Sequence, residues 1–327
     1  MKIVTHWLFA LVTLIIVSYI GWQEPQVKQI LKLKSFDLLF QSQPKEKSPD
    51  IGIVTIDEAS IEKYGQWPWD RRVIGDLLVK LREAQVGVIM MPILFSEPDR
   101  LGGDEQLANL LQGSFVVIAQ VGTSQTNKNS VPRGVAKVGD PLPWLFEWDG
   151  MLGPIPEFHV ADGVGVINTA PEIDGVVRRV PLIMKIGDDT YPAMAVEVIR
   201  VATGNPSYQV KSGPTGIQAV RVPGFPVIKT DANARIWLTW NKEYDIVSAS
   251  SDDFSSLTGK TVVVGITAEG LASIIATPIG EQYDYMLSAS TLDTVLSGKS
   301  IQRHDLSPLG ETLAAILIGF SVIVLVR

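Results

Sequence analysis

Apolar residues follow three patterns along this chain: long runs at both ends, short β-branched runs in the middle, and helical stripes between these. Ile51–Ile56 is a short apolar run that stops at Asp57, as in a strand buried on both faces. The apolar positions of residues 73–81 recur every three or four residues behind Asp70, whose carboxylate can accept from the first turn of a helix. Residues 86–90 form a second buried strand. Because a strand, a helix and a strand in series make a crossover, we expect the two strands to be parallel.

The next elements continue this pattern. Asp104 can cap a short helix that runs to Leu111 and ends at Gly113. Phe115–Val121 is then a third buried strand. Gly122–Val160 is rich in Gly, Pro, Asn and Trp, and we expect a long excursion over the surface. The predicted fold class is α/β, with a doubly wound, mostly parallel sheet and additional β-hairpins.

The second half alternates strands and turns. Asp174-Gly175 predicts a hairpin between its flanking strands. Pro192 is placed at the first position of a helix that runs to Gly204, and a last helix ends at Gly298. The predicted strands and the last helix are Val164–Asn168, Val176–Ile186, Ile217–Val222, Val227–Lys229, Arg235–Trp240, Lys260–Ile266 and the helix Tyr285–Leu296.

The two terminal runs change the class of protein. Ile3–Gly21 and Leu309–Val326 are each long and apolar enough to span a bilayer. We therefore expect transmembrane helices over residues 1–22 and 306–327, with residues 23–305 translocated between them as an extracytoplasmic domain. A cleaved signal peptide is the alternative for the first run, although no small-residue cleavage site follows it. A membrane helix followed by Arg327 alone predicts that a cytoplasmic part has been cut away.

Residues 23–42 carry apolar side chains among lysines. They form either a surface helix packed on the domain or a stalk helix between membrane and domain.

Composition excludes several functions. The 327 residues have 46% hydrophobic and 19% charged side chains and a net charge of −7, which disfavours nucleic acid as a partner. There is no cysteine, so disulfides, thiolate metal sites and a cysteine nucleophile are excluded. The three histidines lie far apart in sequence, without metal-ligand spacing. We predict no catalytic residues, no metal and no cofactor.

Candidate binding residues follow the buried strands. The carboxyl ends of parallel strands meet at one edge of a sheet, where doubly wound folds bind ligands. This edge is predicted to gather polar side chains, each of which can equally be a turn or cap residue. The candidate ligand-binding residues are Asp57, Glu58, Trp67, Trp69, Arg71, Ser96, Glu97, Asp99 and Thr267.

Three motifs have competing interpretations. Trp67-Pro68-Trp69 is either packed on the core or an aromatic wall for a ligand or partner. Asp174 with Arg178 and Arg179 is either an ion-pair cluster or an anion site. Residues 259–261 read Gly-Lys-Thr, but Phe254 replaces the required glycine and a strand follows, so a phosphate-binding loop is rejected.

Five motifs in series resemble one family. They are IGIVTIDEASIEKYGQWPWDRR with LLVKL and VGVIMMPILFSEPD; DEQLANLL; INTAPEIDGVVRRVPL; YPAMAVEVIR; and SSLTGKTVVVGITAEGLAS. Together they resemble the second type of CHASE domain, the cyclase/histidine-kinase-associated sensory extracellular domain. The resemblance implies a sensory module of a bacterial transmembrane receptor, followed by a cytoplasmic cyclase or kinase output domain. Pro92 and Ser288 depart from the family pattern, which usually has an aspartate and a histidine-bearing element there.

Three functions remain in view. The first is a sensor domain in the bacterial inner membrane, with its main domain periplasmic, that binds an unknown small molecule, forms a homodimer and passes a rearrangement to its membrane helices. The second is an extracytoplasmic scaffold that dimerises the receptor without a ligand. The third, a hydrolase that uses Asp57 and Glu97, lacks an accompanying ligand set, and we expect no enzyme activity.

Overall fold

The computed structural model describes residues 7–23, 25–125, 130–301 and 307–326. The chain divides into two compact units. The larger is Gln43–Ile301, and the smaller is formed by Met1–Ser42 with Gln302–Arg327.

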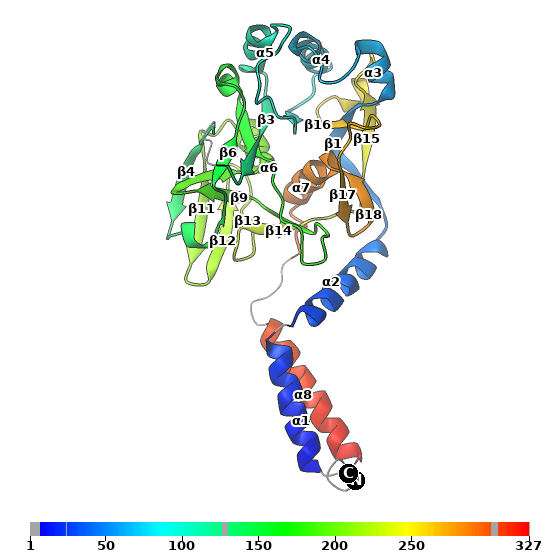
Figure 1. The fold of residues 1–327 in the computed structure, drawn as a ribbon, viewed down its shortest axis with the longest axis vertical. Coiled ribbons are helices and arrows are strands. Elements are labelled where there is room, and N and C mark those ends of the chain that lie inside the picture. Colours follow the sequence, from blue (N-terminus) through cyan, green and yellow to red (C-terminus); the bar gives the residue numbers. More distant parts are fainter. Residues whose placement is uncertain (1–6, 24, 126–129, 302–306, 327) are drawn as a thin grey trace. The chain divides into compact units, whose positions relative to one another are not determined.

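The larger unit is built on one sheet whose strands are parallel except for β6 (Figure 1). Its order is β15-β1-β16-β2-β3, and β7 and β6 both pair with β3. The prediction of a doubly wound, mostly parallel sheet is confirmed. The strands are β15 (Lys242–Ser248), β1 (Glu46–Ile56), β16 (Thr261–Ile266), β2 (Ile89–Met91), β3 (Val116–Thr123), β7 (Gly163–Val166) and β6 (Gly150–Leu152).

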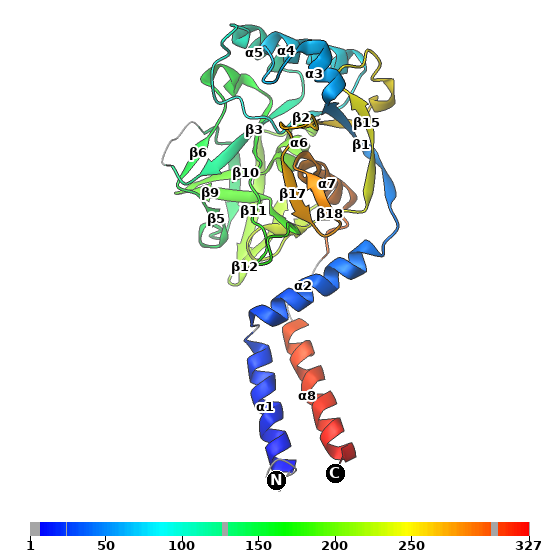
Figure 2. The same cartoon turned by 45° about the vertical axis from the view of Figure 1, so that its right-hand side comes forward.

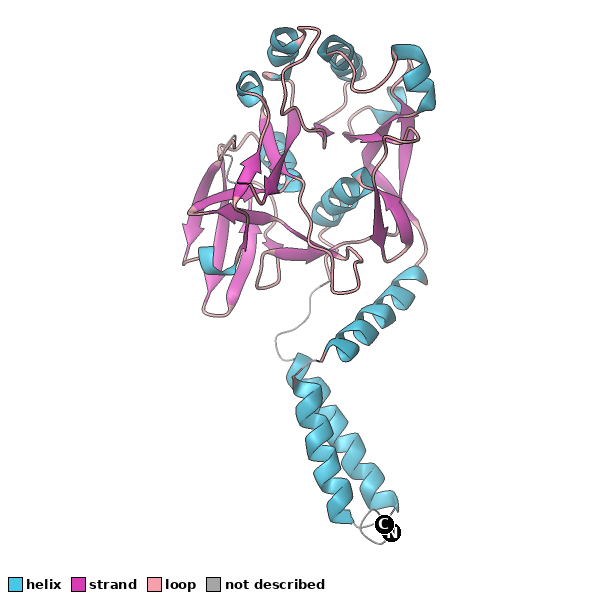
Figure 3. Ribbon diagram, viewed as in Figure 1, coloured by secondary structure: helices cyan, strands magenta, loops and turns pink. Residues whose placement is uncertain are grey.

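Helices cover both faces of this sheet (Figure 3). Val54 of β1 packs into the core under α4 (Arg71–Glu83) and α5 (Asp104–Leu111). Its neighbour Ile53 points the other way, into the core under α6 (Met194–Ala202) and α7 (Tyr285–Ser297). Successive residues of a strand face opposite sides, so an uninterrupted apolar run is what a strand between two helical layers requires. A short helix, α3 (Glu58–Tyr64), follows β1 directly.

Smaller sheets pack around this α/β body (Figure 2). They have the strand orders β10-β9-β5, β13-β12-β11-β4, β14-β8 and β17-β18. Their strands are β4 (Gly134–Val138), β5 (Phe146–Glu147), β8 (Arg179–Pro181), β9 (Ile183–Ile186), β10 (Asp189–Pro192), β11 (Ser207–Gly213), β12 (Gly216–Arg221), β13 (Ile228–Lys229), β14 (Arg235–Trp237), β17 (Ile274–Thr277) and β18 (Gly280–Tyr283). Three short 3-10 helices complete the unit: η1 (Leu142–Trp144), η2 (Pro156–Val160) and η3 (Ser255–Leu257).

Some local predictions were wrong. Gly122–Val160 is not a surface excursion, because it contains strands and 3-10 helices and buries Met151 and Phe158 in the core. Asp174-Gly175 is a turn, in which Glu172 N–H bonds the Val176 carbonyl at 3.0 Å. It makes no hairpin, however, since β8 pairs with the distant β14.

Two helix starts also differ from the prediction. Pro192 is the last residue of β10, and α6 begins two residues later at Met194. Asp104 is not a cap, because Gly103 holds the N-cap position of α5. The carboxylate of Asp104 turns outward instead and accepts from the backbone N–H of Asp99 at 2.7 Å.

The described part of the smaller unit contains three helices: α1 (Trp7–Trp22), α2 (Gln26–Gln41) and α8 (Ser307–Val326). Helices α1 and α8 pack side by side (Figure 1). Gly319 makes the approach close, since a Cβ there would lie 2.4 Å from a methyl of Leu14. Lys32 of α2 pairs with Glu311 of α8 at 3.1 Å. Among the residues that the structure describes, no helix is long and apolar enough to cross a membrane. The predicted transmembrane helices over residues 1–22 and 306–327 are therefore not supported by the described helices.

Candidate functional site

Asp57 stands at the carboxyl end of β1 and caps α3. One of its oxygens, Oδ1, accepts from the Ser60 N–H at 3.0 Å, from the Ser60 hydroxyl at 2.7 Å and from the Ser248 hydroxyl at 2.8 Å. Ser248 continues to Ser250 at 2.7 Å, so β1, α3 and the end of β15 share one hydrogen-bond network. Burial alone would raise the pKa of Asp57, but the hydrogen bonds from Ser60 and Ser248 outweigh it and hold the pKa below its usual value.

Glu58 and Thr267 lie at the same sheet edge. The Glu58 carboxylate accepts from the backbone N–H of Glu269 at 2.6 Å, and Thr267 donates its backbone N–H to Ile56 at 2.9 Å. These contacts join the ends of the neighbouring strands β1 and β16, which pair in parallel register. The structure therefore brings Asp57, Glu58 and Thr267 together at one edge of the sheet. Their role as ligand contacts stays a prediction.

Arg71 opens α4 and is the centre of a second group. Its guanidinium lies 4.7 Å from the centre of the Phe95 ring, and Nε pairs with Asp104 at 3.3 Å. An Nη donates to the Glu97 carbonyl at 3.0 Å. The Arg71 side chain is only 11% exposed. Nε, one Nη and the flat face of the guanidinium are thus engaged by the protein itself, and Arg71 supports the segment after β2.

Asp99 holds that segment from the other side. Its carboxylate accepts from the backbone N–H groups of Arg71, Leu101 and Gly103, all at 3.1 Å. Burial alone would raise the pKa of Asp99, but the hydrogen bonds from these three backbone N–H groups outweigh it, so the pKa lies below its usual value. Glu97 is exposed and Ser96 partly buried. The structure brings Arg71, Glu97 and Asp99 together around the start of α4.

The two tryptophans of the loop before α4 stack on the core. Trp69 is 3% exposed, and its Nε1 donates to the Gly65 carbonyl at 2.8 Å. The Trp67 ring meets the Trp69 ring edge-on at a centroid distance of 5.4 Å. Trp69 thereby satisfies its only polar atom inside the protein, as a core residue does. Trp67 is partly buried against the same core, which favours the packing interpretation of this loop.

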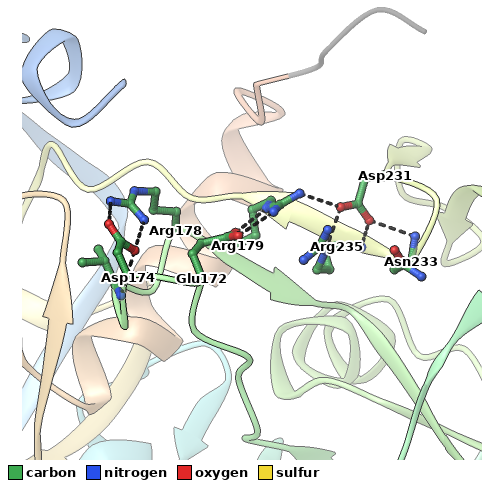
Figure 4. Close-up of polar contacts among 8 residues, drawn as sticks. Glu172, Asp174, Arg178, Arg179, Asp231, Asn233 and Arg235 are labelled. Atoms are coloured by element: carbon green, nitrogen blue, oxygen red, sulfur yellow. Dashed lines mark hydrogen bonds and ion pairs between the residues drawn. The ribbon is translucent and has the colours of Figure 1, made fainter. Parts of the chain in front are cut away.

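The segment that begins at Glu172 forms a row of ion pairs, drawn in Figure 4. Arg178 makes two bonds of 2.8 Å to the two oxygens of Asp174. Arg179 binds Glu172 in the same two-pronged way, at 2.6 and 2.7 Å. Its guanidinium also lies 3.3 Å from Asp231. Both arginines are thus paired with carboxylates of the chain itself, and the ion-pair interpretation is confirmed. The N–H groups in these pairs are not available to bind an external anion.

A second buried charge cluster was not found from the sequence. Glu197 of α6 is fully buried and accepts from Arg200 at 2.8 and 2.9 Å. Arg133 lies 3.4 Å away, and burial lowers the pKa of its guanidinium. Two opposite charges three residues apart on an otherwise apolar helix were the signal that could have shown it. Among the described residues, no group of three or more His, Asp or Glu side chains is arranged as metal ligands.

Comparison with known families identifies the chain. A family model, the CHASE2 domain, matches residues 10–326. The chain belongs to the CHASE2 domain family. The resemblance drawn from the five sequence motifs is thereby confirmed. Neither the search of curated proteins nor the search of solved structures gave a match.

The CHASE2 family is one of extracellular sensory domains, and this gives the fold its context. The motif that carries the Asp174–Arg178 pair is one of those on which the resemblance rests, and it proves to be structural. The motif around Asp57 lies at the sheet edge, where its serine network joins three elements. The family match includes residues of both compact units, since it begins in α1 and ends in α8.

Proposed function

We propose that this chain is the extracytoplasmic sensory module of a bacterial transmembrane receptor, held in the inner membrane by its apolar terminal segments. The single observation that carries the proposal is the CHASE2 match over residues 10–326. The larger unit would lie in the periplasm and detect a signal, and the flanking helices would pass it to a cytoplasmic cyclase or kinase.

The surfaces of α1 and α8 support the membrane part of this proposal. Both helices expose large apolar side chains over most of their length. A soluble surface rarely carries so much contiguous apolar area, whereas lipid or a partner would cover it. The exposed apolar residues are Phe9, Val12, Ile15, Ile16, Val17, Leu313, Leu317, Ile318, Phe320, Val322 and Val324.

The larger unit also offers a point from which a signal can leave. Glu46, the first residue of β1, pairs with Lys242 at 2.9 Å and with Lys299 at 3.2 Å. Residue 46 follows directly on the segment from α2, and residue 299 directly precedes the segment to α8. The first strand and the last helix of the unit are therefore tied together where the chain enters and leaves it. A rearrangement that shifts β1 against α7 would reach both connections at once.

The experiment is a receptor chimaera. The chain would be expressed with a diguanylate cyclase fused after Arg327, and membrane attachment tested by extraction at alkaline pH. We expect the fusion to stay with the membrane and its cyclase output to change with an external condition such as pH, salt or a solute mixture. Extraction into the soluble fraction, or an output identical under all conditions, would contradict the proposal.

A ligand-independent dimerisation scaffold is the second candidate, favoured by the self-satisfied contacts of Arg71, Asp99 and Trp69. A thermal-shift screen of the whole chain separates the two, because a molecule that binds only the native state raises its melting temperature. A sensor of small molecules should respond to at least one solute. A scaffold should respond to none and should cross-link as a homodimer at every condition.

A further inference from the structure

A buried carboxylate of the last helix has one oxygen without a partner. Asp293 of α7 is 4% exposed, and its Oδ2 is buried with no hydrogen bond. Two further buried side-chain oxygens, Ser48 Oγ of β1 and Tyr244 Oη of β15, likewise lack a partner of good geometry. Buried polar groups are normally paired, and an unpaired one calls for an explanation. Among the described residues, the Asp57 network, the row of ion pairs and the Glu197 cluster contain no buried carboxylate oxygen without a partner.

The backbone brings the three residues into one region: Ser48 lies in the stretch of β1 opposite Tyr244 of β15, and helix α7, which carries Asp293, packs against β1. The Ser48 hydroxyl and the charge of Asp293 interact, and so do Asp293 and the Tyr244 phenol. They come from the first strand, the edge strand and the last helix of the larger unit, so one small polar cluster joins all three elements. We call Ser48, Tyr244 and Asp293 the base cluster.

The strand above the base cluster is irregular. β1 and β15 pair at Lys47–Glu243 and again at Gly52–Asp245. Between these pairs, residues 48–51 of β1 lie opposite Tyr244 alone. Such a bulge interrupts the ladder with β15 and bends the bulged strand. The bulged segment contains Ser48, so its conformation is linked to the side chain that faces Asp293.

The charges around Asp293 act in both directions. Burial is the largest influence and raises the pKa of Asp293. The Ser48 hydroxyl, Lys242 and Lys299 favour the ionised form, whereas Asp50 opposes it. Burial and the charge of Asp293 together raise the pKa of Tyr244, so its phenol stays protonated. The group that changes charge within this cluster is therefore the carboxyl of Asp293.

We propose that Asp293 is a proton-binding site, and that its protonation sets the conformation of the bulge at residues 48–51 through Ser48 and Tyr244. In acid the carboxyl takes a proton from solvent and keeps it, and its O–H can then donate a hydrogen bond to the hydroxyl oxygen of Ser48 or Tyr244. When that proton leaves, the carboxylate is an ionised group in the interior, where no described residue donates a hydrogen bond to its Oδ2. The proton is then a stimulus that the larger unit detects. Its transfer to α2 and α8 rests on the proposed sensory function, whereas proton binding itself does not.

Thermal unfolding of the full-length protein tests the site, with Asp293→Asn as the variant. A group with a raised folded-state pKa binds its proton more tightly in the native than in the unfolded state, so acidification stabilises the fold and neutral pH weakens it. Asparagine has the shape of the protonated acid and no charge. We expect D293N to melt above wild type by about 3 °C at neutral pH, and the difference to vanish as the pH falls to the pKa of a free aspartate. Asp188→Asn, which removes an exposed charge from the turn before β10, is the matched control and should behave as wild type.

Hydrogen exchange and infrared spectroscopy give independent readouts. After correction for intrinsic exchange rates, the protection factors of amides 48–52 should depend on pH in wild type and should be independent of pH in D293N. The infrared band of a protonated carboxyl should persist to a higher pH in Ser48→Ala, because that variant loses a hydroxyl that favours the charged form. The proposal would be overturned if D293N and wild type had the same dependence of melting temperature on pH, or if their infrared spectra showed the same carboxyl band. A chimaera that fails to signal while both measurements succeed would instead count against the proposed function alone.

Discussion

Asp174 and Arg178 form two parallel bonds of 2.8 Å, and the arginine side chain is completely buried. The pair lies four residues apart across the Asp174-Gly175 turn, where Gly175 adopts a φ of 78° that favours glycine. The turn thus folds the chain back so that the Asp174 carboxylate reaches the buried guanidinium of Arg178. The charged motif around Asp174 and Arg178 therefore has a structural role.

Asp174→Ala should destabilise the larger unit severely. Removal of one member of a buried ion pair leaves the other charge desolvated, at a cost of about 3–5 kcal/mol in the free energy of unfolding. Urea unfolding of the full chain measures it. Glu243→Ala is the control, since its pair with Lys45 is exposed on both sides and should matter little. Equal midpoints for the two variants would show that the pair contributes no more than a surface contact.

The sequence predicted the parts of the fold that follow from hydrophobic period. Ile51–Ile56 lies inside β1, the short helix predicted behind Asp104 ends at Leu111 as α5 does, and Gly298 ends α7 in the left-handed conformation. The edge strand β15 was missed because its residues, KEYDIVS, are half polar and only partly buried. An edge strand owes its place to its neighbour, here β1, and such tertiary pairing leaves little local signal.

The candidate site was predicted in outline only. Parallel strand ends placed Asp57, Glu58 and Thr267 correctly at one edge. No local pattern in the sequence indicates that Ser248, nearly two hundred residues further along the chain, completes the Asp57 network. Nor could it show that Arg71 is engaged by Phe95, Asp104 and a carbonyl, because side-chain partners depend on how α4 docks against the segment after β2.

Asp57→Ala tests the cap of α3. Loss of the capping carboxylate should reduce the free energy of unfolding by about 1 kcal/mol at neutral pH. Because the pKa of Asp57 is lowered in the folded state, its contribution is complete above the pKa of an unfolded aspartate and is lost as the pH falls through the folded value. The difference between wild type and variant in denaturant titrations should therefore shrink in acid. Glu62→Ala, an exposed change within the same helix, serves as the reference, and a gap that widens in acid would refute this account of Asp57.

Arg71→Lys distinguishes a structural from a ligand-binding arginine. Lysine keeps the charge but has no flat face for Phe95 and no fork to reach both Asp104 and the Glu97 carbonyl. We expect a loss of about 1 kcal/mol in the free energy of unfolding, with the response of the chimaera to its stimulus kept. Arg100→Lys, at an exposed neighbouring position, is the matched change. If R71K were as stable as wild type but abolished the response, Arg71 would belong to a binding site after all.

Glu46→Gln tests the tie between the two connections of the larger unit. The carboxylate has its pKa lowered by hydrogen bonds from Lys242 and Lys299, so it is ionised at neutral pH and holds the start of β1 to the residue beyond α7. A contact between two exposed side chains such as Glu46 and Lys299 adds little to stability and is weakened by salt. The variant should therefore melt close to wild type, yet the chimaera should show a changed basal output, because β1 and α7 can now shift independently. Lys299→Gln should give the same change, and the double variant no more than either alone, since each of the three removes the contact between Glu46 and Lys299. Glu281→Gln, on the exposed start of β18, should leave the output unaltered. Additive effects of E46Q and K299Q would mean that the two residues act separately, and the tie would then have no part in transmission.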